Sequence, residues 1–593
     1  MGSRYHVKVD GVGFLVGAGS YRRFAPGRVE GKPWTVTDWR RGDGHPVAGE
    51  AGGFRAGFGV EIGAAGRLSL APGVAASLAT GDATYAGMAP FLGKLYVVCS
   101  ASGAVSAFDG AAWTVPYTAP ATLRSLGQAY GELMIGAADG KVYSWDPVAN
   151  VWGLRFTVAA AGEVTAVIET TVNEPVTGGF QVARRSVFGL SKASGSGKMV
   201  AIDAGATTTL SMDVGESRVE AMANYRGKLY LATSWGSAAS GGRLLAYGLR
   251  GGTTFWDLTE AAAFSDAAPV SLVVADGLLW LGMASGCVMA WDGTRVVEAV
   301  DLASRGVAAP GQLRGLANLG ERVCMGYAHP AQGAALMVRQ PAAVSGAAFG
   351  LAGARDGWVM ESASGVAGTV SALGVYGGTV LFWGDTAAGA TIYLRRLDAW
   401  RTSGEVELGS WDGGDPSAVK VLDAVFVGHD ALRAGESVRV SYSLDGGGWT
   451  VLGSSATVGS AFATLAWSGV VVCRRLELKA ELLSVSAALG PALTGLTLAH
   501  TLAGSGKRHW RFDARCEGVP GVPLRLLDGS MEPMFGTALS GCLWTAYGAG
   551  VVAFEDLDGV VYQVLFRSLE EDPGKLPQDR GAQMAARCEL VEW

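Results

Sequence analysis

Histidine and cysteine side chains often bind metals or act as nucleophiles, and this chain has six histidines and seven cysteines. The histidines lie at positions 6, 45, 329, 429, 500 and 509, and the cysteines at 99, 287, 324, 473, 516, 542 and 588. None follows the HxH, HxxxH or CxxC spacing of metal and redox sites, and no GxSxG nucleophile motif occurs. We therefore predict no metal site, no disulfide framework and no catalytic residue. The sequence does not exclude a Ser–His–Asp triad, because the three residues meet in space and need not be close in the sequence.

Three short motifs resemble ligand-binding loops, and each departs from its pattern. Residues 195–199 (Gly-Ser-Gly-Lys-Met) resemble a phosphate loop, but Lys192 stands where the first glycine belongs and Met199 replaces Ser or Thr. Residues 443–449 resemble an Asp-box turn of sialidase-like propellers, which is a fold element. Residues 556–559 (Asp-Leu-Asp-Gly) lack the remaining ligands of an EF-hand. We predict a blade-connecting loop at the first place, hairpin turns at the other two, and no bound cofactor.

A short phrase recurs along the chain: a turn glycine, a hydrophobic strand, a small-residue turn and a second strand. Alternation with a period of two and β-branched or aromatic residues indicate strands, bounded by Gly, Asp and Ser turns. No helix pattern competes, and the alanine-rich residues 258–268 predict one or two turns at most. The copies begin at Gly93, Gly131, Arg185, Gly227, Gly277, Gly320 and Gly377.

These copies predict a mostly β fold with a β-propeller of seven blades, within a range of six to eight. A hairpin that cannot bury its own faces must stack on its neighbours, and a period of roughly 40 to 55 residues is typical of propeller blades. A β-sandwich or solenoid with irregular hairpins is the alternative. The predicted parts are an N-terminal β segment with a long docking loop (1–80), the β-propeller (81–414), an antiparallel β-sandwich (415–503) and a small C-terminal β-rich assembly domain (504–593).

Composition and charge exclude several classes of protein. A net charge of −6 and a pI near 5.7 argue against nucleic-acid binding, which needs a basic surface. No apolar run is long enough for a membrane span, and the polar, alternating start is no signal peptide. Only 17% of the residues are charged and the mean hydropathy is +0.26. We therefore expect a homo-oligomer that buries much of its surface between copies.

One region stands out as a candidate contact between subunits. Residues 21–49 are rich in Arg, Gly and Pro and form a longer loop than compact domains usually contain. We predict an inter-subunit arm here, with a surface loop of no such role as the alternative. Deleting residues 20–50 should then prevent assembly while the remainder folds. The candidate side chains are Arg22, Arg23, Arg28, Arg40 and Arg41.

The order of these features resembles that of minor tail or baseplate (tail-tip) structural proteins of long-tailed bacteriophages. The resemblance covers most of the chain, and its motifs are structural and not catalytic. It implies a virion component near the tail tip, made in the host cytoplasm and assembled with other phage tail proteins as a ring or spike. The residues that carry it are 37–44 and 67–72, the repeats, 442–449, 474–478, 491–498 and 556–562.

We therefore expect a non-enzymatic virion protein whose propeller is a rigid platform for assembly and host contact. Tyrosine and tryptophan exposed at a propeller rim can bind sugars or proteins. A host-receptor or glycan-binding propeller is thus the second hypothesis, and the partner would be a host-surface glycan or protein. A polysaccharide-degrading enzyme is the third, although no pair of carboxylates is indicated.

Overall fold

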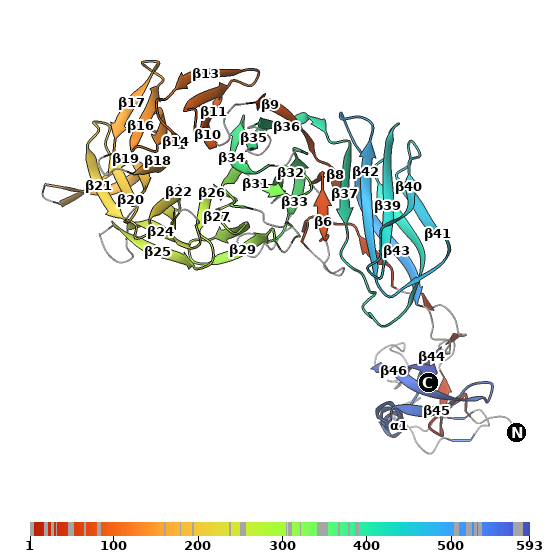
Figure 1. Ribbon diagram of the computed structural model, residues 1–593. Helices are drawn as coiled ribbons and strands as arrows, with labels where there is room; N and C mark the ends of the chain where they lie inside the picture. The colour runs from red at the N-terminus through yellow and green to blue at the C-terminus, as the bar shows by residue number, and fades with distance from the viewer. Residues whose placement is uncertain are drawn as a thin grey trace, which may run out of the picture.

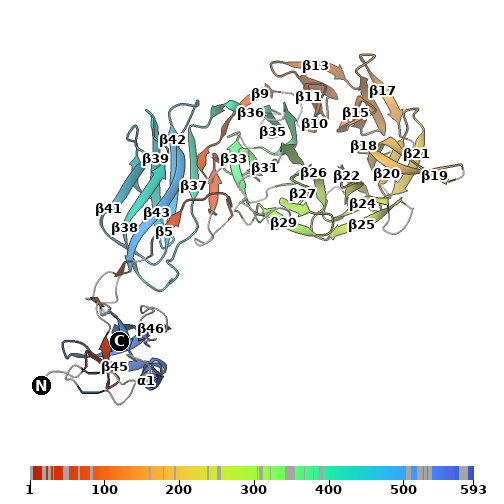
Figure 2. The same ribbon diagram turned by 180° about the vertical axis from the view of Figure 1, so that it is seen from behind.

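A computed structural model gives the protein three bodies: a ring of β-sheets, a β-sandwich and a small barrel, with the sandwich in the middle (Figure 1). The view from behind shows the same arrangement (Figure 2). The fold is mostly β, as the repeats predict, and α1 (Thr537–Gly548) is the one helix among the described residues. No helix in that part of the chain is long and apolar enough to cross a membrane. The structure describes residues 5–16, 22–24, 29–30, 32–44, 53–63, 67–79, 85–158, 162–177, 179–192, 195–236, 239–249, 256–303, 305, 307, 311–320, 322–340, 354–365, 368–377, 380–385, 391–502, 509–516, 525–526, 530–531, 537–572 and 585–592.

The ring consists of antiparallel sheets that follow one another along the chain, each with four strands in sequence order from the inside outward. The first three sheets contain β10 (Tyr85–Phe91), β11 (Lys94–Cys99), β12 (Ala104–Phe108) and β13 (Trp113–Thr118); β14 (Leu123–Ala129), β15 (Glu132–Ala137), β16 (Lys141–Asp146) and β17 (Val151–Thr157); and β18 (Glu163–Val176), β19 (Gly179–Ser191), β20 (Lys198–Ile202) and β21 (Thr208–Asp213). The next three contain β22 (Arg218–Tyr225), β23 (Lys228–Ser234), β24 (Gly242–Leu249) and β25 (Trp256–Phe264); β26 (Pro269–Ala275), β27 (Leu278–Met283), β28 (Cys287–Trp291) and β29 (Val296–Asp301); and β30 (Gly315–Leu319), β31 (Arg322–His329), β32 (Gly333–Arg339) and β33 (Trp358–Ala363).

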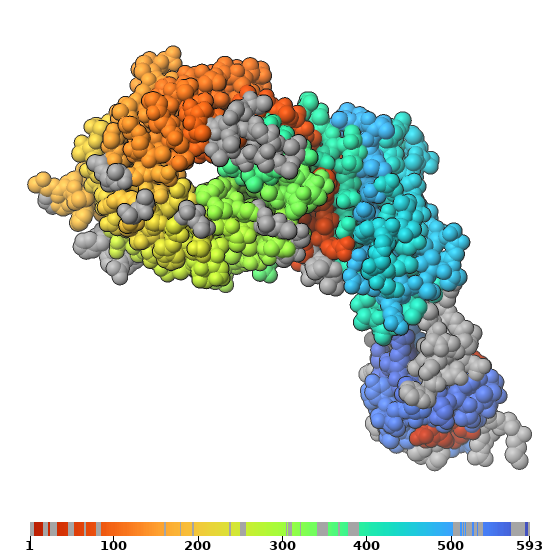
Figure 3. All heavy atoms as spheres, in the orientation of Figure 1, coloured from red at the N-terminus to blue at the C-terminus, as the bar shows by residue number. Residues whose placement is uncertain are grey.

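The last sheet closes the ring with a strand from the other end of the repeat region. It contains β34 (Val370–Tyr376), β35 (Val380–Asp385), β36 (Thr391–Trp400) and, as its fourth strand, β9 (Pro72–Ala79). The first strand of each sheet lies beside the first strand of the next, and β34 lies beside β10. The result is a β-propeller, and the space-filling view shows an opening at the centre of the ring (Figure 3).

The turn glycines of the repeat join the first two strands of a sheet. Tyr130 and Gly131 have φ of 54° and 75°, and Asp276 and Gly277 have 51° and 70°. Two successive residues with positive φ are the mark of a type I′ turn, whose twist matches that of the two strands it joins. The same pair of conformations recurs at 92–93 and 226–227. The repeated glycine is therefore a requirement of the hairpin and not of a ligand.

The sandwich shares a sheet with the ring. Beyond β33 this nine-stranded sheet continues through β6, which pairs in parallel with β33 at Met360 and Phe58 and antiparallel with β37. The β33–β6 link is this single residue pair, so the stiffness of the joint between ring and sandwich rests also on the buried side chains around it. The sandwich strands of this sheet are β6 (Ala56–Phe58), β37 (Ser403–Glu407), β42 (Leu476–Ser484), β39 (Glu436–Leu444) and β40 (Thr450–Ser455).

A seven-stranded sheet forms the other layer of the sandwich. The core between the layers includes Trp39 and Phe54, both 0% exposed, and Trp411. Residues from near the N-terminus thus pack against strands from beyond residue 400. The strands are β41 (Phe462–Cys473), β38 (Lys420–His429), β43 (Ala492–Leu502), β8 (Leu68–Leu70) and β7 (Val60–Ile62), and β43 also pairs with β4 (Val29–Glu30) and β5 (Trp34–Val36).

Four charged side chains are packed at the joint between ring and sandwich. Arg395 on β36 donates two hydrogen bonds of 2.7 and 2.6 Å to Glu361 on β33, and their side chains are 2% and 0% exposed. Arg322 on β31 binds Glu61 on β7 at 2.9 Å. Burial raises the pKa of Glu61, and the nearby Glu361 carboxylate raises it further. The cluster links the last two ring sheets to the sandwich.

The two ends of the chain build the third body together. Its sheet runs β2–β1–β45–β46–β47–β44, and a further pairing of β2 with β44 closes it into a barrel. Phe14 from the N-terminal part packs with Trp510, Phe512 and Phe554, and α1 adds Leu543. The strands are β1 (Val7–Val9), β2 (Val12–Val16), β44 (His509–Arg515), β45 (Val551–Glu555), β46 (Val561–Asp572) and β47 (Ala585–Glu592), with β3 (Arg22–Phe24) paired to β44.

The first 80 residues are therefore divided differently from the single N-terminal segment that the sequence predicts. β1, β2 and β3 belong to the barrel, β4 to β8 belong to the sandwich, and β9 belongs to the ring. The reason is that short strands with few local partners find theirs in distant parts of the chain. The twelve-residue helix α1 also differs from the expectation of no helix pattern.

We predict that the Glu361→Gln variant is destabilised by about 3–5 kcal/mol, because it leaves the Arg395 guanidinium buried without its counter-charge. The matched control is Asp398→Asn, which breaks the exposed Arg396–Asp398 pair on the same strand, where less than about 1 kcal/mol should be lost. Urea unfolding followed by tryptophan fluorescence measures both. Equal losses in the two variants would contradict a special role for the buried pair.

Candidate functional site

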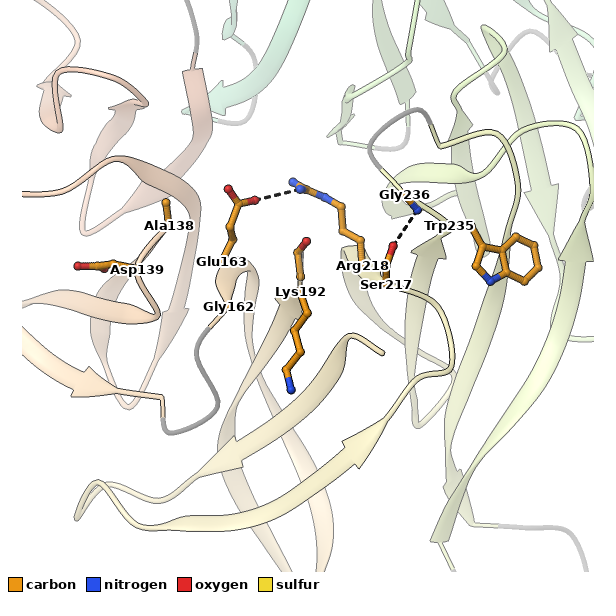
Figure 4. Close-up of a pocket in the computed structure, with 10 residues that line it drawn as sticks. Ala138, Asp139, Gly162, Glu163, Lys192, Ser217, Arg218, Trp235 and Gly236 are labelled. Atoms are coloured by element: carbon orange, nitrogen blue, oxygen red, sulfur yellow. Dashed lines mark hydrogen bonds and ion pairs between the residues drawn. The ribbon is translucent and has the colours of Figure 1, made fainter. Parts of the chain in front are cut away.

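A hollow lies on one face of the ring, where the innermost strands β18 and β22 begin. Its volume is about 950 Å³. The close-up shows the paired side chains of Glu163 and Arg218 on its wall (Figure 4). Backbone at the ends of β15, β19 and β23 provides the rest of the lining. The lining residues are Ala138, Asp139, Gly162, Glu163, Ser191, Lys192, Ser217, Arg218, Trp235 and Gly236.

Glu163 and Arg218 belong to a longer chain of alternating charges on this face. Arg124 at the start of β14 and Arg218 at the start of β22 bind the two carboxylate oxygens of Glu163, each at 3.0 Å. Arg218 also reaches Glu220 at 3.1 Å, and Arg314, which precedes β30, reaches the same Glu220 oxygen at 3.0 Å. This series of ion pairs therefore ties together the inner strands of several ring sheets.

Burial differs along this chain of charges. The side chain of Glu220 is 1% exposed and also accepts a hydrogen bond of 2.7 Å from Ser234. Glu163 is 31% exposed, and Arg314 is 37% exposed. The series of ion pairs thus contains one buried carboxylate, Glu220, and solvent-exposed side chains beside the hollow. Buried charges need such partners, because an unpaired one would cost several kcal/mol.

The free groups of the hollow are suited to binding. Lys192 has no ion-pair partner among the described residues, and its side chain extends away from the Glu163–Arg218 pair (Figure 4). Trp235 is 49% exposed at the rim and also points away from that pair (Figure 4). The two carboxylates of the hollow are held in ion pairs, Asp139 with Lys141 and Glu163 with two arginines. The arrangement can bind polar or charged groups.

The sequence did not single out these residues, although a signal is present. Charged side chains stand at or just before the first strand of several repeat copies, at Arg124, Glu163, Arg218 and Arg314. The signal is weak, because Arg124, Arg218 and Arg314 stand at different distances from the turn glycines Gly131, Gly227 and Gly320. Which charges meet across the ring depends on its closure, which is a long-range property.

The candidate arm residues are used within the chain. Arg23 forms ion pairs with Asp558 at 2.6 Å and Asp556 at 3.1 Å in the barrel. Arg40 binds Asp38 at 2.5 Å. These contacts are intramolecular and do not form one projecting loop.

The other arginines of this group lie in three different settings. Arg22 is exposed and pairs through its backbone with β44. Arg41 binds Asp356, between β32 and β33, at 3.4 Å. Arg28 lies outside the described residues. The structure therefore does not bring the five arginines together.

The histidines and cysteines were the other candidates for chemistry, and those described here contact neighbouring residues of the fold. His429 contacts Ser455 at 2.8 Å, and burial lowers its pKa. His500 packs edge-on against Trp411 with ring centroids 4.5 Å apart. None of the seven cysteines forms a disulfide, and burial raises the pKa of Cys324 to about 12. No group of three potential metal ligands occurs in the part of the chain that the structure describes.

The three loop-like motifs have partners within the chain. Residues 195–199 lie at the start of β20, between two strands of one ring sheet, so they do not connect two blades. Lys198 binds Asp213 at 3.3 Å. Asp445 accepts hydrogen bonds from the backbone of residues 474 and 475. Asp556 accepts one of 3.1 Å from the indole of Trp510. Each of these contacts is made within the chain.

Comparisons with known proteins add structural neighbours at low identity. No protein-family model matches the chain, and no curated protein sequence matches it. The WD40 β-propeller domain of Doa1 is similar at 12% identity and a TM-score of 0.37, over 55% of this chain and 97% of that one. BamB from Moraxella catarrhalis is similar at 12% identity and a TM-score of 0.34, over 56% of this chain and 99% of that one. The extracellular domain of BT4673 from B. thetaiotaomicron is similar at 11% identity and a TM-score of 0.35, and this chain covers 40% of its length.

We predict that deletion of residues 20–50 prevents the sandwich from folding, because it removes β5 and the fully buried Trp39. This expectation replaces the sequence-based one, in which the remainder folds. The control is Arg40→Gln, which breaks a half-exposed pair with Asp38 and should keep the native melting temperature within a few degrees. Circular dichroism and limited proteolysis measure both. A deletion protein as protease-resistant as the full chain would contradict the prediction.

Proposed function

We propose that this protein is a structural component of a bacteriophage tail tip or baseplate. Its seven-bladed propeller would serve as a rigid platform, with the sandwich and the barrel as attachment domains. The observation that carries the proposal is the nine-stranded sheet that runs from the ring into the sandwich. A platform that transmits force between neighbours needs such a stiff joint, whereas a catalytic domain does not. The resemblance in domain order supports the same assignment.

The proposed partners are other phage tail proteins and further copies of this chain. The protein would be made in the host cytoplasm and would reside in the virion tail. Only 17% of its residues are charged, which favours large buried interfaces, because the cores of such interfaces are depleted of charged residues. The hollow with its ion-paired carboxylates supports a binding role over an enzymatic one.

The tail assignment is tested by locating the protein in virions. An epitope tag inserted at Val148, which is 94% exposed in the turn between β16 and β17, should leave the ring intact. We expect antibody label at the tail tip in electron micrographs of purified virions. Purified, infectious virions that contain none of the tagged protein would overturn the proposal.

A second candidate function is binding of a host-surface glycan or protein by the face of the ring. The exposed Trp235 and the unpaired Lys192 beside the hollow favour it. Aromatic side chains and cations are common anchors for such partners. The platform role and the binding role can coexist in one tail-tip protein.

We predict that soluble protein adsorbs to host cells and that Trp235→Ala weakens adsorption at least about tenfold, a typical loss for an aromatic anchor. The matched control is Trp449→Ala, which removes a tryptophan that is 37% exposed on the sandwich and should leave adsorption unchanged. Flow cytometry with labelled protein measures both. Equal adsorption by the two variants would exclude Trp235 as the anchor.

A further inference from the structure

The two outer faces of the sandwich differ sharply in charge. On the nine-stranded sheet, Arg439 binds Glu481 through hydrogen bonds of 2.6 and 2.7 Å. On the same face Lys479 reaches Glu405 at 3.4 Å, and Arg55 binds Glu407 at 2.7 Å. Such ion pairs are typical of a face that stays in water.

The outer face of the seven-stranded sheet carries neutral and small side chains instead. The ladder places Thr464, Phe426 and Thr497 in one row across β41, β38 and β43, and Ala466, Ala424 and Ala499 in the next. Phe426 stacks on Phe462 of the preceding row, with ring centroids 6.0 Å apart. β41 and β43 contain no charged residue. Thr464 and Ala466 on the edge strand are exposed and the other four are half-buried, so a neighbour can approach β41 without desolvating a charged side chain.

β41 forms one edge of this sheet, and among the described strands it pairs with β38 alone. The pairing is regular over residues 462–466 and resumes at residues 471–473 after an irregularity at 467–470. Phe462, Val470 and Val472 are 55%, 70% and 50% exposed. Soluble proteins usually protect such an edge with lysine, proline or a bulge. Residues 462–466 contain no lysine or proline, and the irregularity at 467–470 confines the regular edge to them. A second β-strand can replace water as the partner of their outward backbone groups.

β41 is complementary to itself when it is turned about Thr464. In an antiparallel pair centred there, Thr464 faces its counterpart, Phe462 faces Ala466, and Ala463 faces Leu465. Each bulky side chain thus meets a small one, and Thr–Thr is a favourable cross-strand pair. A neutral strand also meets no like-charge repulsion from its copy.

We propose that β41 is the edge at which two copies of this chain pair, antiparallel across a two-fold axis at Thr464. Such an isologous contact joins the two seven-stranded sheets into one. The small, neutral side chains beside the edge let the second copy approach closely. The pairing does not depend on the tail-tip assignment, because it follows from the strand itself.

Sedimentation velocity on the full chain tests the proposal. We expect a dimer, and we expect Thr464→Lys to raise its dissociation constant at least about tenfold, because two ammonium groups would oppose each other on the axis. The matched control is Ser437→Lys, on the outer face of β39, which should leave the dimer unchanged. A monomeric wild type, or a Thr464→Lys protein that stays dimeric, overturns the proposal.

A second variant keeps the test independent of folding defects. In Thr464→Cys the two new thiols would face each other at the axis, so mild oxidation should give a covalent dimer. Wild-type protein, with its seven native cysteines, is the control and should remain uncrosslinked. A Thr464→Cys protein with a native melting curve and no crosslink overturns the proposal.

Discussion

The pairing of β9 with β36 is the constraint on which the rest of the molecule depends. A ring of sheets has a seam, and here the seam is sealed by backbone hydrogen bonds between residues near 75 and residues near 393. The same short segment also supplies β6 to the joint and β7 and β8 to the sandwich. Ring, joint and sandwich are therefore completed by one stretch of chain. Loss of that stretch would leave the ring and the sandwich with unpaired strand edges, each a site for aggregation.

Charge is sparse in this chain and is placed where sheets or bodies meet. Arg395 and Glu361 hold the joint, and the series from Arg124 to Arg314 ties the inner strands of the ring. Buried pairs of this kind add little net stability, because desolvation offsets their attraction. Their effect is on specificity: a sheet placed in the wrong order would bury a charge without a partner. The same ion pairs engage the Glu163 carboxylate and Arg218, so Lys192 is the cation of the hollow that has no ion-pair partner among the described residues.

Local features were predictable from the sequence, and long-range ones were not. The turn glycines, the hairpins and the mostly β fold follow from φ requirements and alternation within a few residues, as at Tyr130–Gly131. The path of residues 1–80 does not, because β1 and β9 find their partners hundreds of residues away. α1 was missed because its two glycines and two threonines have weak helix propensity. The alanine-rich residues after 256 form the strand β25, since pairing with β24 outweighs alanine's helix preference. The ion pairs of the hollow were not predicted either, because only the long-range closure of the ring brings Glu163 to Arg124 and Arg218.

The positions of the ring face and of β41 allow both proposed contacts at once. β41 lies on the side of the sandwich away from the ring in both ribbon views (Figure 1, Figure 2). A second copy joined at this edge therefore leaves the hollow on the ring uncovered. Because the nine-stranded sheet fixes the ring to the sandwich, pairing at β41 would also set the angle between two rings. One neutral strand would thus determine how a pair of binding faces is presented, without any contact between the rings themselves.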